Sequence, residues 1–201
     1  MPAGQGLREK DLYKMKRGSF GYLQAAKKAS LIKSCLMLAT VLIIFFAAYF
    51  YFHTKKNVFS ILAAVGALPT GRSIVGTVMF MRAKSASLKV KEAVDQAAEL
   101  PEGCSGYDLY LTAYERAYSV SHLTVVDGIV AGITEDEKTD CALCEKHLRD
   151  MLRKDRHPGY EVHIYRDLDK YVEEIERLSG LESESLQEDR EVMNMILMIS
   201  L

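Results

Sequence analysis

The residues of this chain whose types and spacing best suit metal or redox chemistry lie in its second half. Cys141, Cys144 and His147 are spaced three residues apart, so on a helix they partly share one face. Thiolate and imidazole are ligands that zinc prefers, but a closed site needs a fourth ligand from elsewhere. Cysteine is also a common small core residue. The spacing favours core packing and leaves a weak metal or redox site as the alternative.

A second candidate for chemistry is an acidic run that follows a predicted β-hairpin. Asp127 lies in the hairpin turn, and Asp136 and Lys138 follow it. With the predicted order α-β-β-β-α-β over residues 85–166, these residues distantly resemble the PD-(D/E)xK nucleases. The resemblance implies carboxylates that hold Mg²⁺ and a lysine that steadies the developing charge. A turn and a helix cap account for the same residues, and the acidic charge of this half disfavours nucleic acid as a partner.

The other common catalytic motifs are absent from the sequence. It contains no glycine-rich phosphate loop, no Gly-x-Ser-x-Gly elbow and no His-Glu-x-x-His motif. His122, His157 and His163 are isolated, and each is more typical of a strand or turn than of a catalyst. The sequence therefore leans away from an enzyme, and it predicts no cofactor.

One arginine interrupts an apolar run in the first half of the chain. Arg72 follows Pro69-Thr70-Gly71, and a cation at membrane depth needs water, a lipid phosphate or a carboxyl group beside it. Arg72 is therefore a candidate lipid or ligand contact, unless it simply snorkels from a kinked helix. Ala63, Ala67 and Gly71 recur every fourth residue, a stripe that permits close helix packing within the chain or between protomers.

Two apolar segments must position these residues. Residues 31–52 and 58–81 are each long enough, at 1.5 Å per residue, to cross a hydrocarbon core of about 30 Å. They predict a two-helix transmembrane hairpin, in which Pro69 either kinks the second span or makes it re-entrant. Most flanking lysines and arginines precede the first span or follow the second. This bias predicts an integral, multi-pass membrane protein with both termini cytoplasmic.

The charge divides the chain at the same place. Residues 1–91 contain fifteen Lys/Arg and two acids, whereas residues 92–201 contain eleven Lys/Arg and twenty-five acids. A membrane-facing half joined to a solvated half explains this division. The predicted parts are a basic segment (1–30), the hairpin (31–81), a connecting helix (82–100), a cytoplasmic domain (101–181), and an acidic linker with an apolar tail (182–201).

The cytoplasmic domain is predicted to belong to the α+β class, with a mixed β-sheet covered by helices in the order α-β-β-β-α-β-α. Strands are expected near residues 107–114, 118–126 and 160–165, with an Asp127-Gly128 turn starting a further strand. A helix is expected from Thr134 to about 154, and another over residues 168–178. The apolar tail, too short to span a bilayer, is expected to dock on protein and help hold an oligomer.

These features predict a membrane-anchored interaction or assembly protein. Its cytoplasmic domain would bind a protein partner or self-associate, as a homo-oligomer or a subunit of a membrane complex. One alternative is a membrane-tethered enzyme, either a metal-dependent hydrolase or nuclease-like. Another is a small pore or lipid-handling protein that uses the break between Pro69 and Arg72.

Overall fold

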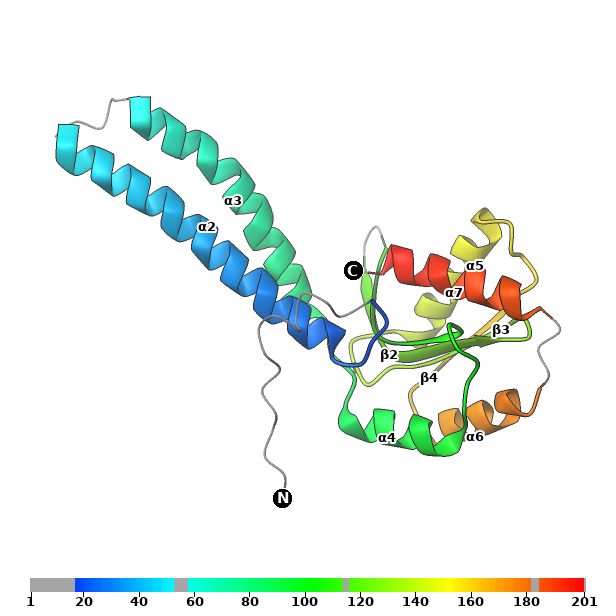
Figure 1. The fold of residues 1–201 in the computed structure, drawn as a ribbon. Helices are drawn as coiled ribbons and strands as arrows, with labels where there is room; N and C mark the ends of the chain where they lie inside the picture. The colour runs from blue at the N-terminus through cyan, green and yellow to red at the C-terminus, as the bar shows by residue number, and fades with distance from the viewer. Residues whose placement is uncertain (1–16, 53–57, 114–115, 182–184, 201) are drawn as a thin grey trace, which may run out of the picture. The chain divides into compact units, whose positions relative to one another are not determined.

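The computed structural model describes residues 17–52, 58–113, 116–181 and 185–200. The chain forms two compact units. The first unit comprises Met1–Tyr13 and Gln24–Arg82, and we call its described part, Gln24–Arg82, the anchor unit. The second comprises Lys14–Leu23 and Ala83–Leu201, and we call it the sheet domain. Figure 1 shows both.

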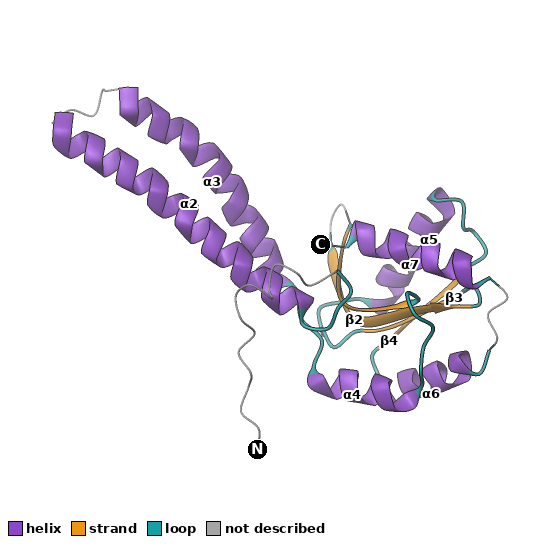
Figure 2. Ribbon diagram, in the orientation of Figure 1, coloured by secondary structure: helices purple, strands orange, loops and turns teal. Residues whose placement is uncertain are grey.

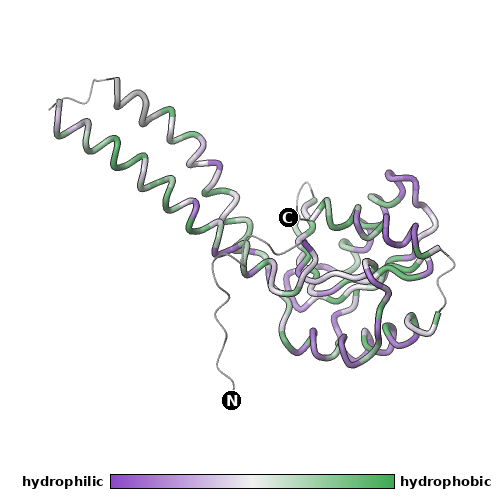
Figure 3. Tube along the Cα trace, viewed as in Figure 1, coloured by the Kyte–Doolittle hydropathy of each residue, from purple (hydrophilic) through white to green (hydrophobic). Residues whose placement is uncertain are grey.

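The anchor unit is built on two long helices, α2 (Tyr22–Phe52) and α3 (Val58–Arg82). Within the described residues, Tyr22–Tyr51 is the one stretch of helix long and apolar enough to cross a membrane. Its apolar side chains are largely exposed, for example Leu36, Ile43 and Phe50, and its trace is mostly hydrophobic in Figure 3. Exposed apolar surface of this length is typical of a helix that meets lipid.

The two helices of the anchor unit are joined by neutral hydroxyl groups. Ser34 hydrogen-bonds Ser73 at 2.8 Å and Thr77 at 2.7 Å, and Ser30 hydrogen-bonds Thr77 at 2.7 Å. We call these four residues the hydroxyl seam. α3 runs without interruption through Pro69, so its backbone forms one helix and not the re-entrant pair of half-helices that the sequence left open.

The sheet domain has a four-stranded mixed sheet in the order β1-β2-β3-β4. Its strands are β1 (Ser105–Thr112), β2 (Ala117–Val126), β3 (Ile129–Ile133) and β4 (Glu161–Tyr165). β1, β2 and β3 are antiparallel neighbours, and β4 is parallel to β3. The predicted α+β class with a mixed sheet is confirmed.

Helices cover both faces of this sheet (Figure 2). One face carries α4 (Leu88–Ala97) and α6 (Leu168–Ser179); the other carries α5 (Cys141–Lys154) and α7 (Leu186–Ile199). Each face has its own apolar core, with Tyr171 and Ile175 central to the first and Leu148 and Met193 to the second. The hairpin turn is as predicted, because Asp127 and Gly128 both adopt positive φ.

The connecting helix predicted over residues 82–100 is wrong in its first part. α3 ends at Arg82, and α4 begins only at Leu88. The intervening backbone donors go to side chains of the sheet domain instead: the Ala86 N–H donates to Asp108 at 2.7 Å, and the Ser87 N–H donates to Glu135 at 2.8 Å. These distant acceptors outweigh a local preference for helix.

The helix predicted to start at Thr134 begins seven residues later, at Cys141. Thr134 is buried, and its hydroxyl donates to the carbonyl of Ser119 at 2.6 Å. The Ser119 N–H in turn donates to the Thr139 hydroxyl at 3.1 Å. These hydrogen bonds attach the loop to β2 and keep it from forming helix. The N-cap of α5 is therefore Asp140, which accepts from Leu143 N–H.

The acidic linker and apolar tail predicted over residues 182–201 form a helix in the part that the structure describes. Val192, Met193 and Ile196 on α7 are fully buried in the core under β1 and β2. The tail therefore docks on its own domain, where its apolar face completes the second core. Contact of the tail with a neighbouring copy stays a prediction.

Candidate functional site

A backbone irregularity in β1 positions the candidate site. Asp108 adopts a φ of 59°, which breaks the alternation of side chains along the strand. Leu109 consequently packs into the core beneath α5 and α7, whereas Tyr107 packs against the core on the α4 and α6 side. Tyr107 pairs across the strands with His122 of β2, and their ring centroids lie 4.3 Å apart.

His122 is fully buried, and its side chain makes one hydrogen bond within the described residues. Its Nδ1 lies 2.7 Å from the hydroxyl of Tyr171 on α6, while Nε2 has no partner there. Burial lowers the pKa of His122 to about 3, opposed by the charge of Asp95. The imidazole is therefore neutral at physiological pH.

The tautomer of His122 follows from its partner. Tyr171 is also fully buried, and burial raises its pKa well above the usual value, so the phenol keeps its proton. The proton needs an acceptor, and His122 Nδ1 is the one at hydrogen-bond distance. We therefore assign the hydroxyl as the donor to Nδ1, which places the imidazole proton on Nε2. Nε2 is then a buried donor without an acceptor among the described residues.

A cavity of ≈ 440 Å³ adjoins this pair. It lies at the C-terminal end of α4, and its lining combines apolar and polar side chains: Val94, Asp95, Ala98, Glu99, Leu100, Ser105, Tyr107 and His122. The Tyr107 hydroxyl donates to Asp95 at 3.2 Å, and Lys91 lies 3.3 Å from the same carboxylate. Asp95 is thus already paired with Tyr107 and Lys91, whereas Glu99, which also lines the cavity, is exposed to solvent.

The predicted cysteine and histidine cluster does not form a metal centre in the structure. Cys144 is fully buried beside Leu148, and burial raises the pKa of its thiol to about 12. Cys141 is half-buried, and the ring of His147 lies 5.8 Å from that of Tyr118. Among the residues that the structure describes, no three His, Cys, Asp or Glu side chains are close enough to hold a metal ion together.

The predicted acidic site is likewise not brought together. Asp127 lies in the exposed hairpin turn, and its backbone N–H donates to Asp189 at 2.8 Å. Asp136 accepts from the backbone of Lys138 at 3.1 Å, and Glu135 accepts from Ser121 at 3.2 Å. The carboxylates of Asp136 and Glu135 hold the loop after β3 in place, and the strand-borne arrangement of the nuclease pattern is not formed.

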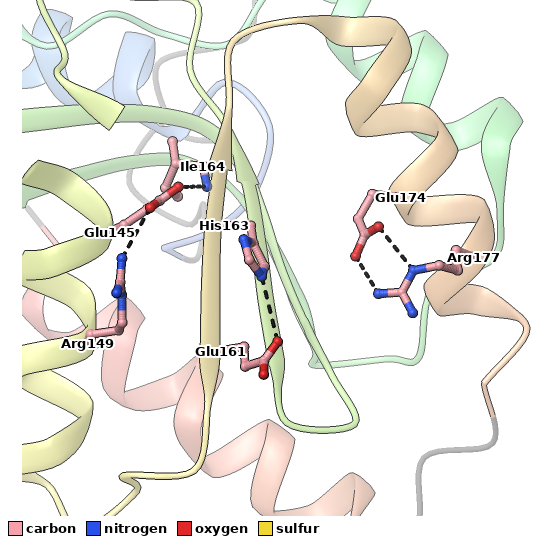
Figure 4. A network of polar contacts seen from close by, with 7 residues as sticks. All are labelled: Glu145, Arg149, Glu161, His163, Ile164, Glu174 and Arg177. Carbon is pink, nitrogen blue, oxygen red and sulfur yellow. Dashed lines mark hydrogen bonds and ion pairs between the residues drawn. The ribbon is translucent and has the colours of Figure 1, made fainter. Parts of the chain in front are cut away.

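A polar network at the sheet edge was not found from the sequence (Figure 4). β4 is one of the two edge strands of the sheet. Glu145 of α5 accepts a hydrogen bond from the backbone of Ile164 at 2.9 Å and pairs with Arg149 at 3.2 Å. On the same strand His163 lies 3.8 Å from Glu161. A charged side chain on an edge strand blocks pairing with another chain, so this network protects the fold.

In the anchor unit, Ala67 and Gly71 of the small-residue stripe do not face α2. Gly71 is exposed, with no atom within 4 Å of where a Cβ would lie, and Ala67 is exposed as well. Ala63 lies outside the residues whose side chains the structure describes. Gly66 instead approaches α2, because a Cβ added to it would lie 3.4 Å from the side chain of Val41. Contact with α2 therefore uses Gly66 and the hydroxyl seam.

Comparison with known proteins adds no functional information: no family model, curated protein or solved structure matches the chain.

Proposed function

We propose that this chain is a membrane-anchored binding protein whose sheet domain takes a small uncharged molecule into the cavity beside His122. The observation that carries the proposal is the buried Nε2–H of His122, which has no acceptor among the described residues. The ligand would supply that acceptor through a carbonyl or hydroxyl oxygen. Because His122 is closed to solvent in this conformation, Tyr107, whose ring packs on His122 and lines the same cavity, must move for the ligand to reach it.

The energetics of His122 support a ligand. A buried donor left without a partner costs about 1–3 kcal/mol. A ligand that accepts from Nε2–H removes this cost, whereas a donor on the surface is already satisfied by water. The cavity wall supplies apolar contacts from Val94, Ala98 and Leu100. Apolar lining with few oriented polar groups is typical of small-molecule sites.

The membrane part of the proposal rests on α2, whose apolar side chains are exposed along its length. The hydroxyl seam supports α3 as a second span packed against it. We propose the topology that the basic flanks predict, with both termini cytoplasmic. A protein partner and self-association stay predictions from the sequence.

Membrane anchoring is tested by fractionating cells that express the full chain and washing the membranes with alkaline carbonate. An integral protein stays in the pellet and is released only by detergent. Recovery of the chain in the carbonate supernatant would contradict the anchor.

Ligand binding is tested with benzamide, whose carbonyl is a good acceptor and whose ring suits the apolar wall. Saturation-transfer NMR on the full chain in detergent should show binding with a Kd of about 1 mM or tighter. The double substitution His122→Phe/Tyr171→Phe removes both polar partners while keeping ring volume, and should abolish the transfer. His163→Phe, at an exposed position on β4, is the matched control. Equal transfer to wild type and the double variant would rule out this cavity.

A further inference from the structure

The charge of the two long helices is entirely positive. Residues 12–91 contain no Asp or Glu, so every charged side chain on α2 and α3 is a cation. Within the described residues, neither Lys33 nor Arg72 has a hydrogen bond or ion pair to another side chain. No carboxylate among the described residues therefore neutralises these two cations.

These two cations line one hollow between the helices. Lys33 from α2 and Arg72 from α3 share a groove of ≈ 280 Å³ with Ser30, Ser73 and Met37. Ser30 and Ser73 belong to the hydroxyl seam, so hydroxyl groups lie beside the cations. Guanidinium, ammonium and hydroxyl groups together are the donor set that recognises a phosphate.

The groove also lies at a defined level along the helices. Residues 34–51 of α2 carry no charge and extend about 27 Å at 1.5 Å per residue, close to the hydrocarbon thickness of a bilayer. Lys33 therefore marks one end of the apolar stretch. Arg72 reaches the same groove from α3, so in a bilayer whose hydrocarbon spans residues 34–51 both cations would lie at the level of the headgroups.

We propose that this groove binds the phosphate of an anionic phospholipid headgroup, with Arg72 as the bidentate donor and Lys33 as the second cation. The inference rests on the proposed membrane anchoring. It assigns Arg72 a partner, because a guanidinium at the edge of the hydrocarbon is stabilised by a lipid phosphate more than by partial hydration.

The test measures phospholipid binding to the purified full chain in detergent by native mass spectrometry. Phosphatidylglycerol should bind more tightly than phosphatidylcholine, and Lys33→Gln/Arg72→Gln should weaken phosphatidylglycerol binding about tenfold or more, since each cation near a membrane surface contributes about 1 kcal/mol. The control, Lys28→Gln/Arg82→Gln, removes the same charge from the same two helices outside the groove, and should change binding less than about threefold.

Three results would overturn the proposal: equal binding of both lipids by wild type, equal losses in the two double variants, or displacement of the lipid by millimolar inorganic phosphate. The last would indicate a site for free phosphate. Failure of the anchor itself is seen separately, as release of the chain by carbonate, so the two proposals fail in different experiments.

Discussion

The anchor unit and the sheet domain satisfy their buried polar groups in opposite ways. In the anchor unit, neutral hydroxyls bond one another and helix carbonyls, as Thr77 does with Ser34 and with the carbonyl of Ser73. In the sheet domain, two buried carboxylates accept backbone N–H groups from distant segments. Neutral hydroxyl pairs cost little to desolvate, whereas a buried carboxylate is stable only when several donors surround it. We therefore expect a single substitution to cost little stability in the anchor unit and much more at the two buried carboxylates of the sheet domain.

The largest effect is expected at Asp108. Its carboxylate accepts from Leu23 N–H at 3.2 Å and from Ala86 N–H at 2.7 Å, and its φ of 59° disfavours alanine. Asp108→Ala should lower the free energy of unfolding of the sheet domain by about 4 kcal/mol. Asp108→Asn keeps one acceptor and tolerates the backbone, so it should lose less than half as much. Urea unfolding followed by circular dichroism measures both, and equal losses would contradict the role of the acceptor.

A smaller loss is expected at Asp189, which ties α7 to the hairpin turn. It accepts from Asp127 N–H at 2.8 Å and from the Tyr160 hydroxyl at 3.0 Å. Asp189→Ala should cost about 3 kcal/mol in the same unfolding assay, because three donors lose their partner, the third being Gly128 N–H at 3.4 Å. Glu188→Ala, one residue earlier and exposed, should cost under about 0.5 kcal/mol. If both variants lose the same free energy of unfolding, Asp189 does not hold α7 to the hairpin turn.

The buried imidazole should give the sheet domain a pH dependence. The pKa of His122 is lowered to about 3 in the folded state, whereas an unfolded histidine titrates near 6.5. As pH falls below about 6.5, His122 is protonated in the unfolded chain but stays neutral in the folded one. The stability that neutral His122 contributes is therefore fully present above about pH 6.5 and is lost progressively as the pH falls toward 3. Between pH 7 and 5.5 the loss should be about 1 kcal/mol. His122→Phe/Tyr171→Phe should abolish this part of the pH dependence. If the free energy of unfolding of the double variant varies with pH as it does in wild type, other groups cause the dependence.

The smallest effect is expected in the hydroxyl seam. Thr77→Val removes hydrogen bonds to Ser30 and Ser34 at nearly constant volume, and hydrogen bonds between helices in membranes average about 0.6 kcal/mol each. Unfolding of the anchor unit in sodium dodecyl sulfate titrations should shift by about 1 kcal/mol. Thr40→Val is the matched control, since that exposed hydroxyl bonds only to Leu36 on its own helix. A loss above about 3 kcal/mol would show that a single hydroxyl of the seam contributes as much stability as a buried carboxylate of the sheet domain.

Elements with strong local signals were predictable from the sequence alone. The Asp127-Gly128 turn, the alternation that indicates β2 and the Asp167 cap of α6 each depend on neighbouring residues. The apolar length of α2 and the separation of charge between the two halves are also local properties of the chain. For such features the conformational preference and the observed structure agree because no distant group competes.

The rest was decided by contacts between residues far apart in the chain. The break before α4, the late start of α5 and the burial of α7 each follow from acceptors or apolar surface that other elements contribute. Asp108, Ser119 and Leu109 are among these residues. The site beside His122 belongs to this class, because an isolated histidine in a strand gives no sign of the phenol that meets it from α6. Local pattern determined which segments are helix, strand or membrane-length. Only tertiary packing decided where those helices stop and which buried donor was left without a partner, since both outcomes depend on hydrogen-bond partners that sequence spacing does not reveal.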